Sequence, residues 1–97
     1  MKISVLSLAK NDLKEIRLLL SECGESPPKK FRESFEKFCA QVVDMPHMFS
    51  KYEQNSNYRK AVIIFGYLVL YKVDESKGKI MIYRVLHSKR NIVPLLD

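Results

Sequence analysis

The sequence predicts an α+β fold in which two helices cover one face of a mostly antiparallel sheet. Three observations predict it: an amphipathic helical hairpin follows a short N-terminal strand, strand-forming residues dominate the second half, and a polar turn joins the last two strands. Each helix carries one apolar stripe, so the pair needs a sheet to cover. We expect a single domain over residues 1–97, with the element order β-α-α-β-β-β.

Residues 2–8 have the composition of a strand and precede the first predicted helix, which covers residues 9–23. The apolar residues of this helix recur at helical spacing. They are Leu13, Ile16, Leu20 and Cys23. Gly24 stands where a left-handed C-terminal cap is favoured. Ser26, followed by two prolines, is typical of the start of a second helix.

The second helix is predicted from about Pro27 to Val43, and Pro46 ends it. Phenylalanines spaced three to four residues apart form its apolar face. We expect six apolar side chains to be buried between the helices and the sheet: Leu13, Ile16, Leu20, Phe31, Phe35 and Phe38.

The remaining strands are predicted over Tyr58–Phe65, Tyr67–Val73 and Lys79–His87. Between the last two lies "DESKG", a polar stretch typical of a hairpin turn. We expect these three strands to form an antiparallel meander. Strict alternation along the final strand places four of its residues on one face: Ile80, Ile82, Arg84 and Leu86.

The composition is that of an ordinary globular protein, with 46% hydrophobic and 29% charged residues. The longest apolar stretch, "AVIIFGYLVLY", is too short to cross a bilayer as a helix, so we expect a cytoplasmic protein without membrane contact. The two cysteines, Cys23 and Cys39, are expected to be buried free thiols. Neither they nor the two histidines show metal-ligand spacing, so no metal or cofactor is expected.

The net charge of +6 is uneven, because residues 51–97 hold nine Lys and Arg against four Asp and Glu, or +5. A basic half suggests an acidic partner, either nucleic acid or an acidic protein segment. The final strand runs directly into part of this charge at His87, Lys89 and Arg90.

Three stretches, in this order and spacing, carry a resemblance to a known family: "NDLKEI" (11–16), "GYLVLYKVD" (66–74) and "RVLHSKRNI" (84–92). With the helical hairpin, they make nearly the whole chain resemble the RelE/ParE superfamily of type II toxins. The resemblance implies the fold described above. It leaves activity open, because RelE-like members cleave mRNA in the ribosome whereas ParE-like members poison DNA gyrase.

The residues at the RelE-like catalytic positions favour one branch. RelE-like members use two lysines on the second strand, an arginine after the Gly-Tyr of the third, an arginine after the fourth and a tail tyrosine. Here Arg59 and Arg90 match two of these positions, whereas Ala61, Leu68 and Leu96 occupy the other three. Alanine and leucine can neither stabilise a phosphorane nor transfer a proton. The resemblance therefore favours the ParE-like branch.

A ParE-like toxin would inhibit growth by binding DNA gyrase and would be neutralised by a cognate antitoxin, an acidic and partly disordered chain. In this branch no residue is expected to be catalytic. The resemblance places target binding at the end of the last strand and just beyond it: His87, Lys89, Arg90, Asn91 and Ile92.

Two alternatives stay open. The first is a ribosome-dependent mRNA endoribonuclease, in which His87 transfers protons and three arginines stabilise charge: Arg59, Arg84 and Arg90. The second is an inactive toxin homologue that serves only as an antitoxin-binding module.

Overall fold

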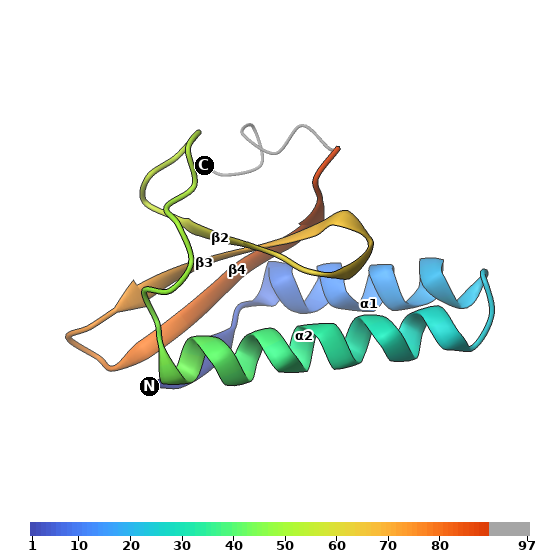
Figure 1. Ribbon diagram of the computed structural model, residues 1–97, viewed down its shortest axis with the longest axis horizontal. Helices are drawn as coiled ribbons and strands as arrows, with labels where there is room; N and C mark the ends of the chain where they lie inside the picture. The colour runs from blue at the N-terminus through green and yellow to red at the C-terminus, as the bar shows by residue number, and fades with distance from the viewer. Residues whose placement is uncertain (90–97) are drawn as a thin grey trace.

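The computed structural model describes residues 1–89 and confirms the predicted α+β fold (Figure 1). Two helices, α1 (Ser7–Ser21) and α2 (Ser26–Asp44), lie side by side and cover one face of the sheet. Its four strands are β1 (Lys2–Val5), β2 (Arg59–Val62), β3 (Tyr67–Asp74) and β4 (Lys79–His87).

The strand order across the sheet is β1-β4-β3-β2. Strands β2, β3 and β4 form the predicted antiparallel meander, and β1 pairs with β4 in parallel. The helical hairpin provides the long crossover that a parallel pair requires. Because β1 has only four residues, its pairing with β4 ends at Ile82, and within residues 1–89 no strand pairs with this edge of β4 beyond that point.

Several element boundaries differ from the sequence prediction. Strand β1 ends at Val5 and α1 begins at Ser7, because the Leu6 carbonyl already accepts a helical hydrogen bond from Lys10 at 2.9 Å. Strand β2 stops at Val62, since residues Ile64–Gly66 form a tight turn into β3. Ser26 lies inside the first turn of α2 and does not cap it.

The main core fills the space between the helices and the sheet. Of the six apolar residues expected there, Ile16, Phe31 and Phe38 are buried, and the other three are only partly buried: Leu13, Leu20 and Phe35. Phe38 is at its centre, with its ring 5.6 Å from that of Tyr71. A second cluster lies on the opposite face of the sheet and includes Leu68, Leu70 and Leu86.

A β-bulge changes the faces of β4. Leu70 pairs with Arg84 and Tyr71 pairs with Ile82, so Tyr83 is the extra residue on β4. Ile80 and Ile82 belong to the helix-facing cluster, but beyond the bulge Val85 takes that side and Leu86 joins the opposite cluster. The prediction that Leu86 shares a face with Ile80 and Ile82 is therefore wrong, because one inserted residue reverses the alternation.

The expectation of two buried thiols is wrong for Cys23, which is exposed just after α1. Cys39 is partly buried, and desolvation raises the pKa of its thiol to about 11. Within residues 1–89, no three side chains of the metal-ligating types come together. Neither helix in this range is long and apolar enough to cross a membrane.

Candidate functional site

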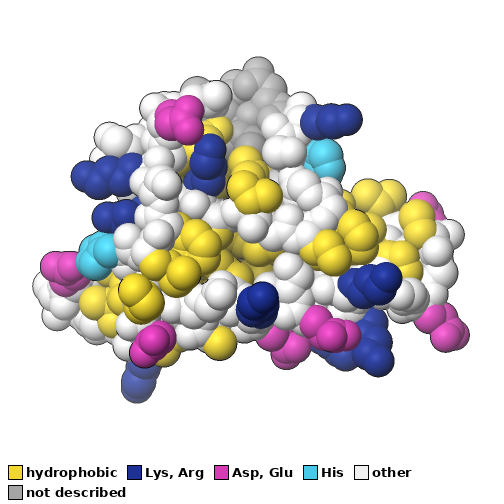
Figure 2. Space-filling model, viewed as in Figure 1, with side chains coloured by type: hydrophobic (Ala, Val, Ile, Leu, Met, Phe, Trp, Pro, Cys, Tyr) yellow, Lys and Arg dark blue, Asp and Glu magenta, His cyan; other side chains and the backbone are white. Residues whose placement is uncertain are grey.

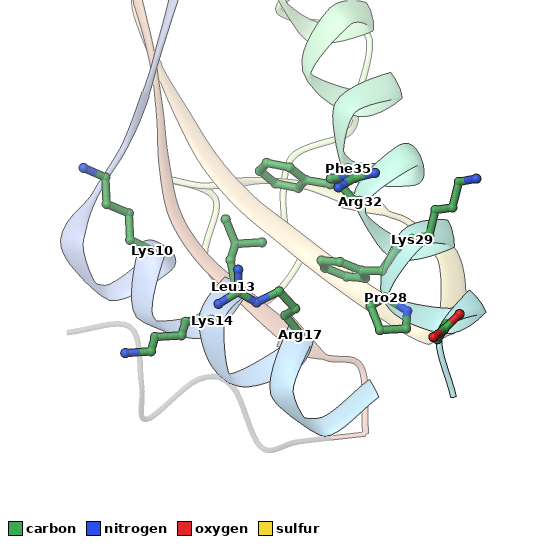
Figure 3. Close-up of a pocket in the computed structure, with 10 residues that line it drawn as sticks. Lys10, Leu13, Lys14, Arg17, Pro28, Lys29, Arg32 and Phe35 are labelled. Atoms are coloured by element: carbon green, nitrogen blue, oxygen red, sulfur yellow. The ribbon is translucent and has the colours of Figure 1, made fainter. Parts of the chain in front are cut away.

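A groove of about 580 Å³ lies between α1 and α2. In Figure 3, Leu13 and Phe35 point into the space between the two helices, while Lys10, Lys14 and Lys29 extend outward at its rim. The partial exposure of Leu13 and Phe35 follows from this position, because they form the floor of an open groove and not the centre of the core.

The rim of this groove is strongly basic. Five cationic side chains line it against one acidic side chain, Glu25. The cations are Lys10, Lys14, Arg17, Lys29 and Arg32. Three of them recur along α1 at intervals of four and three residues, which is the spacing of a single helix face. We name this surface, with its apolar floor of Leu13, Pro28, Phe31 and Phe35, the helix groove.

The sequence prediction missed the helix groove because it counted charge by halves of the chain. Residues 1–50 have eight cations against seven acids, so their net charge is only +1. Most of the acids lie outside the groove, which concentrates the cations on one surface. The signal available in the sequence was the stripe of Lys10, Lys14 and Arg17 on one helix face.

His87 ends β4 and packs against the main core. Its ring meets that of Tyr67 edge to face at 5.2 Å. The Lys89 backbone N–H donates to His87 Nδ1 at 3.2 Å, so in the neutral ring Nε2 carries the proton. The backbone of Gly66 also lies close to this ring, since a Cβ built at Gly66 would lie 3.3 Å from Nε2.

A cavity of about 180 Å³ between α1 and the end of β4 is lined by His87 together with Asp12 and Glu15. The sequence offered no carboxylate near His87, and the fold supplies two from α1. Glu15 Oε1 accepts a hydrogen bond from Asn11 at 3.2 Å and is exposed. A histidine and a carboxylate in one cavity are groups that can move a proton.

Arg84, expected to stabilise charge in a nuclease, is bound to a structural partner. Its Nε and Nη2 donate to the two carboxylate oxygens of Asp12 at 2.8 and 3.0 Å. The Val85 N–H donates to the same carboxylate at 3.0 Å. Asp12 thus accepts a hydrogen bond from the edge of β4 at a position that β1 does not reach. Its hydrogen bonds to Arg84 raise the pKa of that guanidinium. Asp12 is 5% exposed, so this pair is buried.

Among the other nuclease candidates, Arg59 lies away from His87, and Arg90 lies outside the described residues. Arg59 lies opposite Tyr71 and His87 opposite Tyr67, which separates them by about 13 Å along β3. Arg59 Nη1 donates to the Phe49 carbonyl at 2.7 Å. Ala61 is buried in the main core, at the position where a RelE-like member would have its second lysine.

Among the predicted target-binding residues, His87 is partly buried and Lys89 is exposed. The other three, Arg90, Asn91 and Ile92, lie outside the residues that the structure describes. Leu68 is buried in the opposite-face cluster, and Leu96 also lies outside the described range.

Comparisons with known proteins agree with this architecture. Residues 3–92 match the family model of the ParE toxin of the type II toxin–antitoxin system parDE. A search among curated proteins finds no match. The intact RelBE toxin–antitoxin complex of E. coli is similar in structure, with a TM-score of 0.69 and 18% identity over 92% of this chain and 98% of that one.

Two further solved structures are similar at comparable levels. RelBE2 of Mycobacterium tuberculosis gives a TM-score of 0.65 and 19% identity, covering 89% of this chain and 95% of that one. A chromosomal ParDE system of P. aeruginosa gives 0.64 and 15%, covering 92% and 97%. At these identities the likenesses show the fold alone, whereas the family model spans nearly the whole sequence. The chain belongs to the ParE toxin family of type II toxin–antitoxin systems.

Proposed function

We propose that this toxin inhibits growth by binding DNA gyrase through the end of β4 and the residues that follow it. The observation that carries this proposal is that Arg84 and Arg59 are held by Asp12 and by the Phe49 carbonyl. A ribosome-dependent nuclease needs cations free to stabilise the extra charge on a scissile phosphate. Binding a protein target needs only an accessible surface, and Lys89 at the end of the described residues is exposed.

The test separates binding from catalysis. His87→Ala removes one contact of the proposed binding surface but no chemistry, so growth arrest and inhibition of supercoiling should fall much less than the loss of a general acid or base would cause. Lys89→Glu together with Arg90→Glu, or deletion of residues 92–97, should abolish both while the melting temperature is preserved. Lys77→Glu, in the β3–β4 turn, is the matched control for charge reversal. Growth arrest that survives the charge reversals would contradict the proposal.

One observation favours the endoribonuclease as a second candidate. His87 and Glu15 line the same cavity, and a histidine and a carboxylate are groups that can transfer protons. If His87 were a general acid or base, His87→Ala would lower mRNA cleavage by about 10²–10⁴-fold. Codon-phased cuts in ribosome-bound mRNA that disappear in His87→Ala would establish this candidate and exclude gyrase binding as the activity.

For neutralisation, we propose that the antitoxin places an acidic amphipathic segment in the helix groove. The support is the combination of an apolar floor, Leu13 and Phe35 among it, with five cations and one acid at the rim. Apolar anchors would supply the affinity, and the opposite charges would raise the association rate. A segment that folds on binding loses chain entropy, and this cost has to be offset by contacts along its length. An extended groove can provide such contacts.

This part is tested with a synthetic peptide whose helix would place glutamates on one face and leucines on the other. Lys14→Glu with Arg17→Glu should slow its association at least 10-fold, with little change in dissociation. Raising the salt concentration should have the same effect on the wild-type protein. Lys77→Glu again serves as the control. An association rate indifferent to salt would exclude electrostatic steering. Peptide binding without growth arrest would identify the chain as an antitoxin-binding module only.

A further inference from the structure

The turn between β2 and β3 has an aromatic residue in a conformation that such residues rarely adopt. Phe65 has φ 61° and ψ 20°, and it is the one non-glycine residue with positive φ in residues 1–89. Gly66 follows with φ 76°, and the Tyr67 N–H bonds to the Ile64 carbonyl. Positive φ at both central residues is the geometry of a type I′ turn, for which Asn-Gly is strongly preferred.

Packing does not explain the phenylalanine either. The side chain of Phe65 is 42% exposed and that of nearby Val62 is 64% exposed. Phe65 belongs to neither buried cluster, whereas its neighbours Ile63 and Ile64 are partly buried against the main core. Hydrophobic side chains are visible at the surface where Figure 1 shows this turn (Figure 2). The turn thus keeps a partly exposed aromatic residue at some conformational cost.

The backbone around the ring is fixed from three sides. Ile63 N–H donates to the Tyr67 carbonyl at 2.9 Å, and Ile64 N–H donates to Ser34 Oγ of α2 at 3.1 Å. Ser88 N–H donates to the Gly66 carbonyl at 2.8 Å. An aromatic side chain on a fixed backbone loses little entropy on binding, which is a property of interface anchors.

The Ser88 bond also places the turn next to the residues that we assign to target binding, because Ser88 lies between His87 and Lys89. On its other side is a cavity of about 240 Å³ between α2 and β2, in which Lys37 is the one charged lining residue. Phe65 and Val62 are thus exposed apolar residues in a surface that also carries cations, Lys37 in the neighbouring cavity and Lys89 one residue beyond Ser88. The complement of such a surface is an apolar pocket with an acidic rim.

We propose that Phe65 is a target-binding anchor that inserts into an apolar, acid-rimmed pocket on the toxin's protein target. This inference rests on the proposed function and extends the target-binding surface from the end of β4 to the β2–β3 turn. It names a residue that the RelE-like catalytic positions do not include.

The turn geometry offers a variant that removes the ring without harming the fold. Phe65→Asn introduces the residue preferred at this turn position, so its melting temperature should equal or exceed that of the wild type. Growth arrest on induction should nevertheless be lost, and binding to purified gyrase should weaken at least 10-fold. Phe65→Trp should retain both. Leu18→Gln, which replaces an exposed leucine of α1, should change neither.

The growth-arrest assay does not require the target to be known. It therefore tests the role of Phe65 separately from the proposal that the target is gyrase. If Phe65→Asn arrested growth as strongly as the wild type, the anchor would be refuted whatever the target. If the wild type arrested growth without binding gyrase, and Phe65→Asn did not, gyrase would be the wrong target and the anchor would stand. A photoreactive phenylalanine analogue at position 65 should crosslink to protein, and crosslinking to RNA would overturn the proposed pocket.

Discussion

The buried pair between Asp12 and Arg84 should be the polar interaction on which the fold depends most, and Asp12→Ala tests this. The substitution removes the acceptor of three hydrogen bonds at once: two from the Arg84 guanidinium and one from the Val85 N–H. Because β1 pairs with β4 only as far as Ile82, no strand within residues 1–89 is placed to take over the Val85 N–H.

The magnitude follows from the burial of the groups left behind. The Arg84 side chain is 13% exposed, so the unpaired guanidinium would be largely desolvated. Removing one partner of a buried ion pair costs about 3–5 kcal/mol, out of roughly 5–15 kcal/mol for a whole domain. For a domain of this size each kcal/mol lowers the melting temperature by about 4–8 °C. We therefore expect a decrease of more than about 12 °C.

The assay is urea unfolding of wild type, Asp12→Ala, Arg84→Ala and the double variant. Because each single variant leaves a buried charge that the double variant lacks, the double variant should be less destabilised than the sum of the two, with a coupling of about 0.5–3 kcal/mol. Glu15→Ala, on the same helix but exposed, is the control and should cost only a few tenths of a kcal/mol. An Asp12→Ala variant within 1 kcal/mol of wild type would refute the reasoning.

Three further outcomes are expected. Phe38→Ala should lower the free energy of unfolding by about 3–5 kcal/mol in denaturant, because Phe38 is 2% exposed. Phe35→Ala should lower it clearly less, since that ring forms the floor of an open groove. Equal losses of stability in the two variants would contradict this. Burial raises the pKa of Tyr71 from 10.0 to about 12, so the contribution of its neutral hydroxyl to folding stability is fully present below pH 10. About 2–3 kcal/mol of this stability is lost as the pH rises through 12. Tyr71→Phe should flatten that alkaline loss in pH-dependent unfolding, and an unchanged profile would exclude Tyr71 as its source. Gly66→Ala should lower the melting temperature, because the turn needs positive φ at this position. It should also shift the NMR resonances of the His87 ring, because the new Cβ would lie 3.3 Å from it. Unchanged resonances would argue against this close contact.

The elements and the fold class could be predicted because their signals are local. The apolar stripe containing Ile16 has helical spacing, Tyr67–Val73 is rich in aromatic and β-branched residues, and "DESKG" is a polar turn. Patterns among residues close in sequence are therefore enough to predict these elements. The last strand was predicted with its observed limits, Lys79–His87. Its faces were not, because a bulge at Tyr83 depends on how β4 pairs with β3 and leaves no mark in the alternation of β4 itself.

The candidate site depended on the tertiary structure to a greater degree. The sequence by itself determined that a histidine and cations follow the last strand, and that Ala61 and Leu68 cannot do RelE-like chemistry. Only the fold decided that Arg84 is bound by Asp12, 72 residues away in the chain. Only the fold, likewise, combined the cations of two helices into one groove. Charge and hydrogen bonding act through space, so a side chain's role is set by neighbours that the linear order does not show.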